Sequence, residues 1–397
     1  MKFGLQHPNF SFDYDGQANN ISQIADSLKN LITKAENSGF DSFWVMDHFH
    51  QIQFVGRPEE PMLEGWTIIS MLAGITTKIK LGTLVTGVIY RYPSVLAKVA
   101  ATLDVLSKGR LFMGIGAGWN EQESLAYGIS FPSNQERMLR LEEAIQVIRK
   151  MWTEEPYASF NGKYYQIHNA YCNPKPIQKP SPPILVGGSG ERKTLKIVAK
   201  YADACNLFGS PETVRKKLNI LKEHCKSVGK DYDSILKTKL GAIIVDDNKE
   251  MAKNRVQESF RGIPEEQIKE FVIYGTPEDI SRQIEILEQV GIQYLIVDLD
   301  PCREHEALDT FANKVINKMS WLYHCCSAAE NINQLMLFLY YYTFHNCTIY
   351  WGISKVIIHL SWIYPYTYDI IIYSLYTNRN TIYWSVFHSY SSSSIKY

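Results

Sequence analysis

The chain has 397 residues, and its 41 basic and 41 acidic side chains leave no net charge. This balance excludes the basic surface that binds nucleic acids or anionic lipids, and a hydrophobic content of 45% excludes general disorder. Seven cysteines without regular spacing predict neither a disulfide framework nor a zinc site. Because no secretory signal is visible after Met1, we expect a cytoplasmic protein with reduced thiols.

Hydrophobic periodicity predicts strands and helices in alternation through residues 1–320. Apolar runs predict strands at residues 2–6, 41–46, 79–86, 110–115, 183–186, 203–208, 236–245 and 293–297. Apolar steps of three and four predict helices at 21–35, 64–76, 94–107, 135–152, 191–201, 211–228, 247–272, 277–290 and 304–318. Eight such units favour a closed (β/α)8 TIM barrel over a doubly wound sheet, since no GxGxxG follows the first strand.

One segment interrupts this alternation. Six prolines between Glu154 and Pro183 prevent a continuous helix there. We interpret the segment as an insertion over one end of the barrel, acting as a lid or as an oligomer contact.

The candidate site residues follow the predicted strands, because the active sites of such barrels lie at the carboxyl ends of their strands. They are Gln6 and His7, then Asp47 to His50, Thr86 to Val88, Gly116 to Glu121, and Gly187 to Gly190. No set of His, Asp and Glu has metal-ligand spacing, so no metal is expected. No nucleophile motif for covalent catalysis is present either.

Two of these groups carry the strongest chemical signals. The run from Gly187 to Gly190 lies between a strand and a helix predicted to begin at Glu191, where free amides and the helix dipole favour a phosphate. A tight turn that requires glycine is the alternative. His48 at a strand end suits proton transfer, with a hydrogen-bonded structural histidine as the alternative, and Asp47 faces the opposite side if the strand continues.

Five segments, in this order and at these intervals, resemble the bacterial luciferase-like superfamily and, within it, the coenzyme F420-dependent oxidoreductases. They are DSFWVMDHF, KLGTLVTGVIYRYP, LSKGRLFMGIGAGWNEQE, RLEEAIQVIRKMW and PKPIQKPSPPILVGGSGERKTLKIVAKYADACNLFG. The resemblance covers residues 1–320 and implies a (β/α)8 barrel with an insertion region. It also implies coenzyme F420, a deazaflavin hydride carrier, or FMN as in sister branches, and a homodimer, which many members form.

The resemblance further implies roles for particular residues. Asp47 and His48 correspond to a catalytic Asp-His pair whose histidine lies near the reactive ring. A bulge with a non-prolyl cis peptide supports one ring face, which here places Leu84, Val85, Thr86 and Gly87 at the cofactor. The cofactor phosphate is implied to bind the glycine turn formed by Gly187, Gly188, Ser189 and Gly190.

Two positions differ from the sugar-phosphate dehydrogenases of this family, which carry Glu at Trp119 and Trp at Ile52. Glucose-6-phosphate is therefore not the expected substrate. We expect an oxidoreductase that transfers a hydride between coenzyme F420 and another small organic molecule. The expected substrate-pocket residues are Gln6, His7, Trp119 and Asn120. An FMN-dependent monooxygenase and a non-catalytic flavin-binding barrel are the alternatives.

Residues 321–397 form a tail of different composition, with 20 of the 50 aromatic residues but one glycine, one proline and five charged residues. It is interpreted as a membrane anchor, a partner-binding extension, or translated sequence beyond an ancestral stop. Residues 331–354 are uncharged but contain three asparagines, a glutamine and a histidine, so they lack the apolar stretch of about 20 residues that a span requires. Missing helical periodicity and turn residues favour the third interpretation and poor order.

We predict that deleting residues 321–397 leaves cofactor binding intact, because the barrel is complete before the tail begins. Titration of the truncated and full-length proteins with coenzyme F420, followed by fluorescence, measures this. A truncated protein that is folded by circular dichroism but no longer binds the cofactor would contradict the prediction.

Overall fold

The structure is a computed structural model. It describes residues 1–10, 21–53, 55–300 and 304–319, together with the backbone of four strands between residues 347 and 389. The chain divides into two compact units, Met1–Lys318 and Met319–Tyr397.

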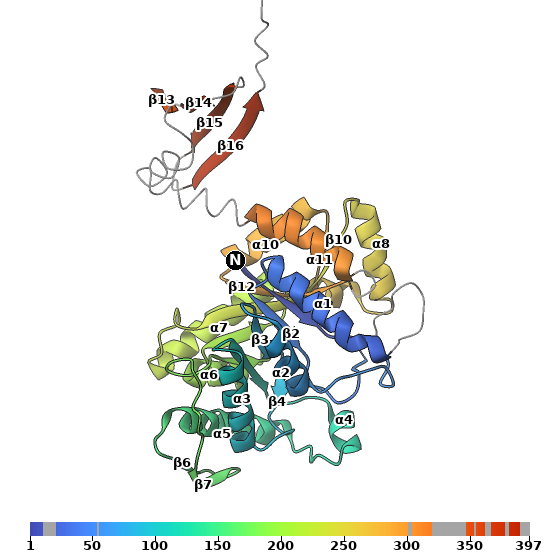
Figure 1. Ribbon diagram of the computed structural model, residues 1–397, viewed down its shortest axis with the longest axis vertical. Helices are drawn as coiled ribbons and strands as arrows, with labels where there is room; N and C mark the ends of the chain where they lie inside the picture. Colours follow the sequence, from blue (N-terminus) through green and yellow to red (C-terminus); the bar gives the residue numbers. More distant parts are fainter. Residues whose placement is uncertain are drawn as a thin grey trace, which may run out of the picture. The chain divides into compact units, whose positions relative to one another are not determined.

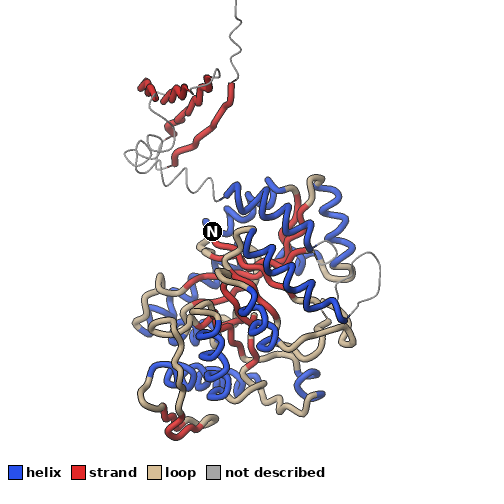
Figure 2. The backbone as a smooth tube through the Cα atoms, viewed as in Figure 1, coloured by secondary structure: helices blue, strands red, loops and turns tan. Residues whose placement is uncertain are grey.

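The first unit is a closed barrel of parallel strands, which confirms the predicted fold. Its neighbouring strands follow the order β12, β1, β2, β3, β5, β8, β9 and β10, and β10 pairs again with β12 to close the circle. The strands are β1 (Lys2–His7), β2 (Ser42–Val45), β3 (Lys80–Thr83), β5 (Leu111–Gly116), β8 (Ile184–Gly187), β9 (Ala204–Leu207), β10 (Leu236–Val245) and β12 (Tyr294–Leu299). Figure 2 shows these strands inside a layer of helices.

The outer helices bury one apolar face each against the strands, as expected for this architecture. They are α1 (Ile24–Asn37), α2 (Gly65–Ile75), α3 (Pro93–Leu106), α5 (Asn134–Thr153), α6 (Thr194–Tyr201), α7 (Pro211–Val228), α10 (Pro277–Gln289) and α11 (Glu304–Phe311). Figure 1 shows α1 beside α11. Lys34 of α1 joins the two through hydrogen bonds to the His305 carbonyl at 2.9 Å and to Asp309 at 2.7 Å.

A cluster of buried side chains fills the inside of the barrel. The cluster consists of Trp44, Phe112, Leu185, Ala204, Leu240, Tyr294 and Ile296. Gly82 makes room for Trp44, because a Cβ atom at this position would lie 2.5 Å from the Trp44 ring and 2.5 Å from the Phe112 carbonyl. The packed layer thus forms a floor beneath the site.

Several connections differ from the sequence-based expectation. The helices expected through residues 247–272 are α8 (Lys249–Ser259) and α9 (Glu265–Phe271), but the strand that follows them, β11 (Val272–Gly275), was not predicted and pairs with β10. Three predicted elements are divided: the first helix begins with the 3-10 turn η1 (Ile21–Gln23), the third strand continues after a break as β4 (Thr86–Gly87), and the last helix includes the π-helix η2 (Ala312–Ile316). The short helix α4 (Glu121–Ala126) was not predicted.

The proline-rich segment contains a hairpin of β6 (Ala158–Asn161) and β7 (Gln166–Ala170). Glu143 of α5 holds this hairpin by accepting hydrogen bonds from the amides of residues 163–165 at 2.8 to 3.1 Å. The hairpin therefore packs on the helical layer. The structure contains two cavities that are lined by residues at the carboxyl ends of the strands, and no residue of the proline-rich segment lines either of them. The expected role of the segment as a lid is therefore not supported.

In the second unit, β13 (Cys347–Gly352), β14 (Lys355–Ser361), β15 (Thr367–Thr377) and β16 (Thr381–Ser389) form an antiparallel sheet in sequential order. Residues 320–346 and the segments between these strands lie outside the described residues, so our interpretation of the tail stays a prediction. Among the described residues, no helix is long and apolar enough to cross a membrane.

We predict that Gly82→Ala destabilises the barrel by about 1–3 kcal/mol, because the new methyl group overpacks the floor against Trp44. Gly74→Ala is the matched control. Gly74 lies within α2, and a Cβ added there would have no other atom within 4 Å, so alanine should stabilise the protein slightly. Urea unfolding of both variants measures the difference; equal free energies of unfolding would contradict the account of the floor.

Candidate active site

Two cavities lie above the floor and share five residues: His48, Leu84, Trp119, Phe208 and Leu240. The first, of about 380 Å³, is lined by the glycines of three strand ends and is called the glycine cavity. The second, of about 490 Å³, is lined mostly by hydrocarbon side chains and is called the apolar cavity. Two molecules bound in the two cavities would therefore meet beside His48.

The glycine cavity owes its shape to the segment after β3. The Leu84–Val85 peptide bond is cis, at the position that the family resemblance implies. The Val85 side chain packs against Gly116 and Gly187, where an added Cβ would lie 2.8 and 2.7 Å from it. Only glycine fits at these two positions, so the ends of β5 and β8 remain open to a ligand.

The glycine turn after β8 forms the far end of this cavity, with Gly187, Gly188, Ser189 and Gly190 all in its lining. Gly188 has a φ of 104°, a value that disfavours side chains. The helix begins at Thr194 rather than at the predicted Glu191. Lys217, which the sequence analysis missed, donates a hydrogen bond from Nζ to Ser189 Oγ at 3.1 Å. Open amides and this cation make the turn suitable for a phosphate.

His48 is held by a buried carboxylate that the sequence analysis missed. Glu123 of α4 accepts a hydrogen bond from His48 Nδ1 at 2.7 Å. The same carboxylate accepts hydrogen bonds from the Phe49 amide and from the Tyr90 hydroxyl, both at 2.5 Å. Because Nδ1 faces Glu123, the imidazole has Nε2 left for a ligand in the cavities.

The charge of Glu123 follows from these contacts. Burial acts to raise its pKa, but hydrogen bonds from His48, Tyr90 and the Phe49 amide outweigh burial and hold the pKa below its ordinary value. Burial and the Glu123 carboxylate in turn raise the pKa of Tyr90. Glu123 is thus an anion at neutral pH, which favours a proton on Nδ1 of His48.

Asp47 lies beside His48 in sequence but has a different partner. Its carboxylate accepts two hydrogen bonds from Arg91, at 2.6 and 3.0 Å, and Arg91 also pairs with Glu64. Asp47 lines neither cavity. Its contacts tie the end of β2 to the segment before α3, so its geometry is that of a positioning residue and not of the catalytic residue expected.

Of the other predicted residues, some line a cavity and others make structural contacts elsewhere in the barrel. Gln6 and Trp119 line the apolar cavity, and the Trp119 ring lies edge-to-face with His48 at 5.7 Å between centroids. His7 was expected in the pocket but faces the helices, because successive residues of β1 point to opposite sides, and its Nδ1 bonds Glu304 at 2.9 Å.

Two further expected ligand contacts are instead structural. Asn120 caps α4 by accepting a hydrogen bond from the Glu123 amide at 3.2 Å, and it lines neither cavity. Thr86 is buried between Trp66 and Thr83, which lie 2.9 and 2.8 Å from its hydroxyl, while Leu84, Val85 and Gly87 do line the glycine cavity.

The sequence profile of the luciferase-like monooxygenases matches residues 1–262. The chain is 36% identical over 176 residues to an F420-dependent glucose-6-phosphate dehydrogenase of Kineococcus radiotolerans. The aligned region covers 44% of this chain and 49% of that enzyme. The chain thus spans about half the length of this relative.

The fold is shared with solved structures. An F420-dependent tetrahydromethanopterin reductase from Methanopyrus kandleri superimposes with a TM-score of 0.65 and 22% identity, over 80% of this chain and 99% of that one. An F420-dependent secondary alcohol dehydrogenase gives a TM-score of 0.66 and 22% identity, over 79% and 98%. The chain belongs to the luciferase-like monooxygenase family of enzymes, as its motifs predicted.

We predict that Glu123→Gln lowers the free energy of unfolding at neutral pH by about 2 kcal/mol, because it removes charged hydrogen bonds from a buried position. The pKa of Glu123 lies below the ordinary 4.5, so the carboxylate stabilises the fold above that pH, and the contribution is lost as the pH falls. The difference between wild type and variant should therefore shrink from pH 6 to pH 3.

Urea unfolding across this pH range measures the effect. Glu121→Gln is the matched control, since Glu121 is an exposed acid in the first turn of the same helix. If the difference in free energy of unfolding between wild type and Glu123→Gln does not change with pH, the charge of the carboxylate does not stabilise the fold.

Proposed function

We propose that this chain is an oxidoreductase that transfers a hydride between coenzyme F420 and a small organic substrate. The observation that carries the proposal is the junction of the two cavities at His48. The glycine cavity suits a flat ring ending in a phosphate, and the apolar cavity suits an organic molecule. A cofactor ring and a substrate would then lie face to face, which is the arrangement that hydride transfer requires.

The residues of the glycine cavity fit this cofactor. Val85 and Leu84 offer a surface for one face of a ring, and the turn of Gly187 and Gly188, with Lys217 beside it, offers donors for a phosphate. When bound, the deazaflavin supplies a carbon that accepts or gives a hydride. The name of the Kineococcus enzyme supports coenzyme F420 over FMN.

His48 is assigned the proton that accompanies the hydride. With Glu123 at Nδ1, Nε2 accepts the proton of a substrate hydroxyl during oxidation and returns it to the oxygen during reduction. Glu123 stabilises the imidazolium formed in between, and Tyr90 keeps the carboxylate oriented. In this scheme, Nε2 of His48 is the atom that holds the proton while the hydride is transferred.

The substrate of the Kineococcus enzyme is not carried over to this chain. A phosphorylated sugar requires cationic side chains, and none of the described residues lining the apolar cavity is Lys or Arg. The Asp300 carboxylate in this lining would also repel a phosphate. The apolar cavity supports an uncharged or weakly polar substrate instead.

Titration of the purified protein with coenzyme F420 and separately with FMN, followed by fluorescence quenching, tests the cofactor. We expect tighter binding of coenzyme F420. Gly187→Ala should weaken this binding, because its methyl group would displace Val85 from the cavity wall. Tighter binding of reduced FMN, with oxygen consumed in turnover, would favour the monooxygenase alternative.

We predict that His48→Ala binds coenzyme F420 as wild type does but transfers hydride about 10²–10⁴-fold more slowly, because it lacks the proton acceptor. Cofactor absorbance, followed in single turnover with a panel of alcohols and ketones, measures the rate. A variant that binds and turns over like wild type would remove His48 from the mechanism. Binding by the wild type without turnover of any panel member would favour a non-catalytic barrel.

A further inference from the structure

We propose that Asp298 is the specificity-determining residue of the apolar cavity, and that it selects a neutral hydrocarbon molecule bearing one carbonyl or hydroxyl oxygen. In this arrangement the Asp298 carboxyl group donates a hydrogen bond to that oxygen. The inference rests on the proposed function for the reaction itself, but ligand selection by Asp298 can be tested without the cofactor.

Three polar side chains of the apolar cavity lie on one side of the barrel. Asp298 of β12 pairs in register with Gln6 of β1, and β1 is followed in the barrel by β2, after which His48 lies. All three side chains line the same cavity. They form a polar arc along three adjacent strands, so a ligand oxygen held by Asp298 would lie on the same side of the cavity as His48.

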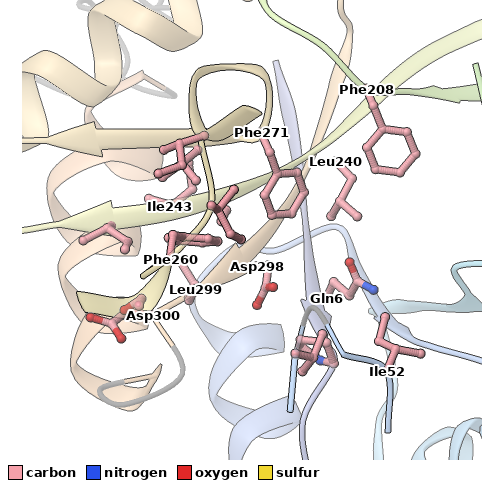
Figure 3. Close-up of a pocket in the computed structure, with 18 of the residues that line it drawn as sticks. Gln6, Ile52, Phe208, Leu240, Ile243, Phe260, Phe271, Asp298, Leu299 and Asp300 are labelled. Atoms are coloured by element: carbon pink, nitrogen blue, oxygen red, sulfur yellow. The ribbon is translucent and has the colours of Figure 1, made fainter. Parts of the chain in front are cut away.

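The opposite wall is hydrocarbon. It is built from β10, α8, α9 and β11, with Ala242, Ile244, Phe260, Ile263, Ile268, Phe271 and Val272 in the lining. Its polar members, Ser259 and Gln267, are exposed to solvent. Figure 3 shows Asp298 between Phe271 and Gln6. A ligand that fills the cavity therefore buries hydrocarbon on this side and meets the polar side chains of the arc on the other.

Asp298 differs from the neighbouring acids Asp300 and Glu304, because those two have partners among the described residues. Asp300 lies 3.9 Å from Arg255, and Glu304 lies 2.9 Å from His7. The Asp298 carboxyl group has no hydrogen bond or ion pair with any of the described residues. Asp298 is half-buried, so a ligand in the cavity would shield its carboxyl group from water. An unpaired polar group in an apolar cavity is costly, which favours a ligand that completes the hydrogen bond of this carboxyl group.

The surroundings also decide which form of the acid is present. Burial raises the pKa of Asp298 well above its ordinary value, and the nearby charges of Glu304 and Asp300 raise it further. The protonated form is a hydrogen-bond donor, which suits a carbonyl or hydroxyl oxygen and not a carboxylate or phosphate. A cationic ligand would have to bring its own charge into a hydrocarbon cavity, which opposes its binding.

Calorimetric titration with two probes of matched shape, 4-tert-butylcyclohexanone and 4-tert-butylcyclohexylamine, tests the proposal. Wild type should bind the ketone more tightly than the ammonium ion. Asp298→Leu removes the donor and should weaken ketone binding about tenfold, the size expected for one hydrogen bond. Asp298→Asn keeps a donor and should bind the ketone within a few-fold of wild type. Asp26→Asn, at an exposed position of α1, is the matched control and should change nothing.

The pH profile provides a readout that a purely structural role would not change. Ketone binding to wild type should weaken as the pH rises and Asp298 ionises, whereas binding to Asp298→Asn should not depend on pH. Tighter binding of the amine by wild type, lost in Asp298→Asn, would overturn the proposal. Equal ketone binding by wild type and folded Asp298→Leu would overturn it as well.

Coenzyme F420 titration of the same variants separates this inference from the proposed function. Asp298 does not line the glycine cavity, so all of these variants should bind the cofactor as wild type does. A protein that selects the ketone through Asp298 but does not bind coenzyme F420 would refute the proposed reaction and leave the assignment of Asp298 standing.

Discussion

The buried carboxylate of Glu123 is the interaction on which the site depends. One side chain of α4 accepts hydrogen bonds from His48, from the Phe49 amide and from Tyr90, so it connects the segments that follow β2, β4 and β5. A buried anion is stable only when its oxygens are well hydrogen-bonded, and the same bonds therefore fix the loops and set the tautomer of the histidine. The Glu123 carboxylate therefore both holds the loops together and orients His48.

The glycines of the barrel provide the second constraint. Large residues fill the barrel at the level of Trp44, while Gly116 and Gly187 keep the ends of two strands free of side chains. Val85 occupies the space they leave and becomes part of a cavity wall. The contrast between a packed floor and an open rim confines ligands to the carboxyl ends of the strands, and the two cavities meet where His48 can reach both.

The parts of this architecture that depend on short-range pattern were predictable. Each barrel strand is a buried apolar run, and Asp47-His48 and the glycine turn lie at strand ends that such runs reveal. Contacts between distant residues were not predictable in this way. Glu123 lies 75 residues from His48, on a helix of six residues that is too short for a periodic signal. Asp298 directly follows the predicted strand at 293–297, but no local motif distinguishes it from the nearby Asp300.

The sequence by itself determined the alternation of strands and helices, the closed barrel and the end of it that carries the site, because burial imposes a pattern on local runs of residues. Only the tertiary structure decided which of two residues adjacent in sequence lines the cavities. The pleat of β1 turns Gln6 inward and His7 outward, and Arg91 draws Asp47 away from the cavities. These outcomes depend on the direction of each side chain and on partners that folding brings close. Residue type and spacing alone specify neither of these.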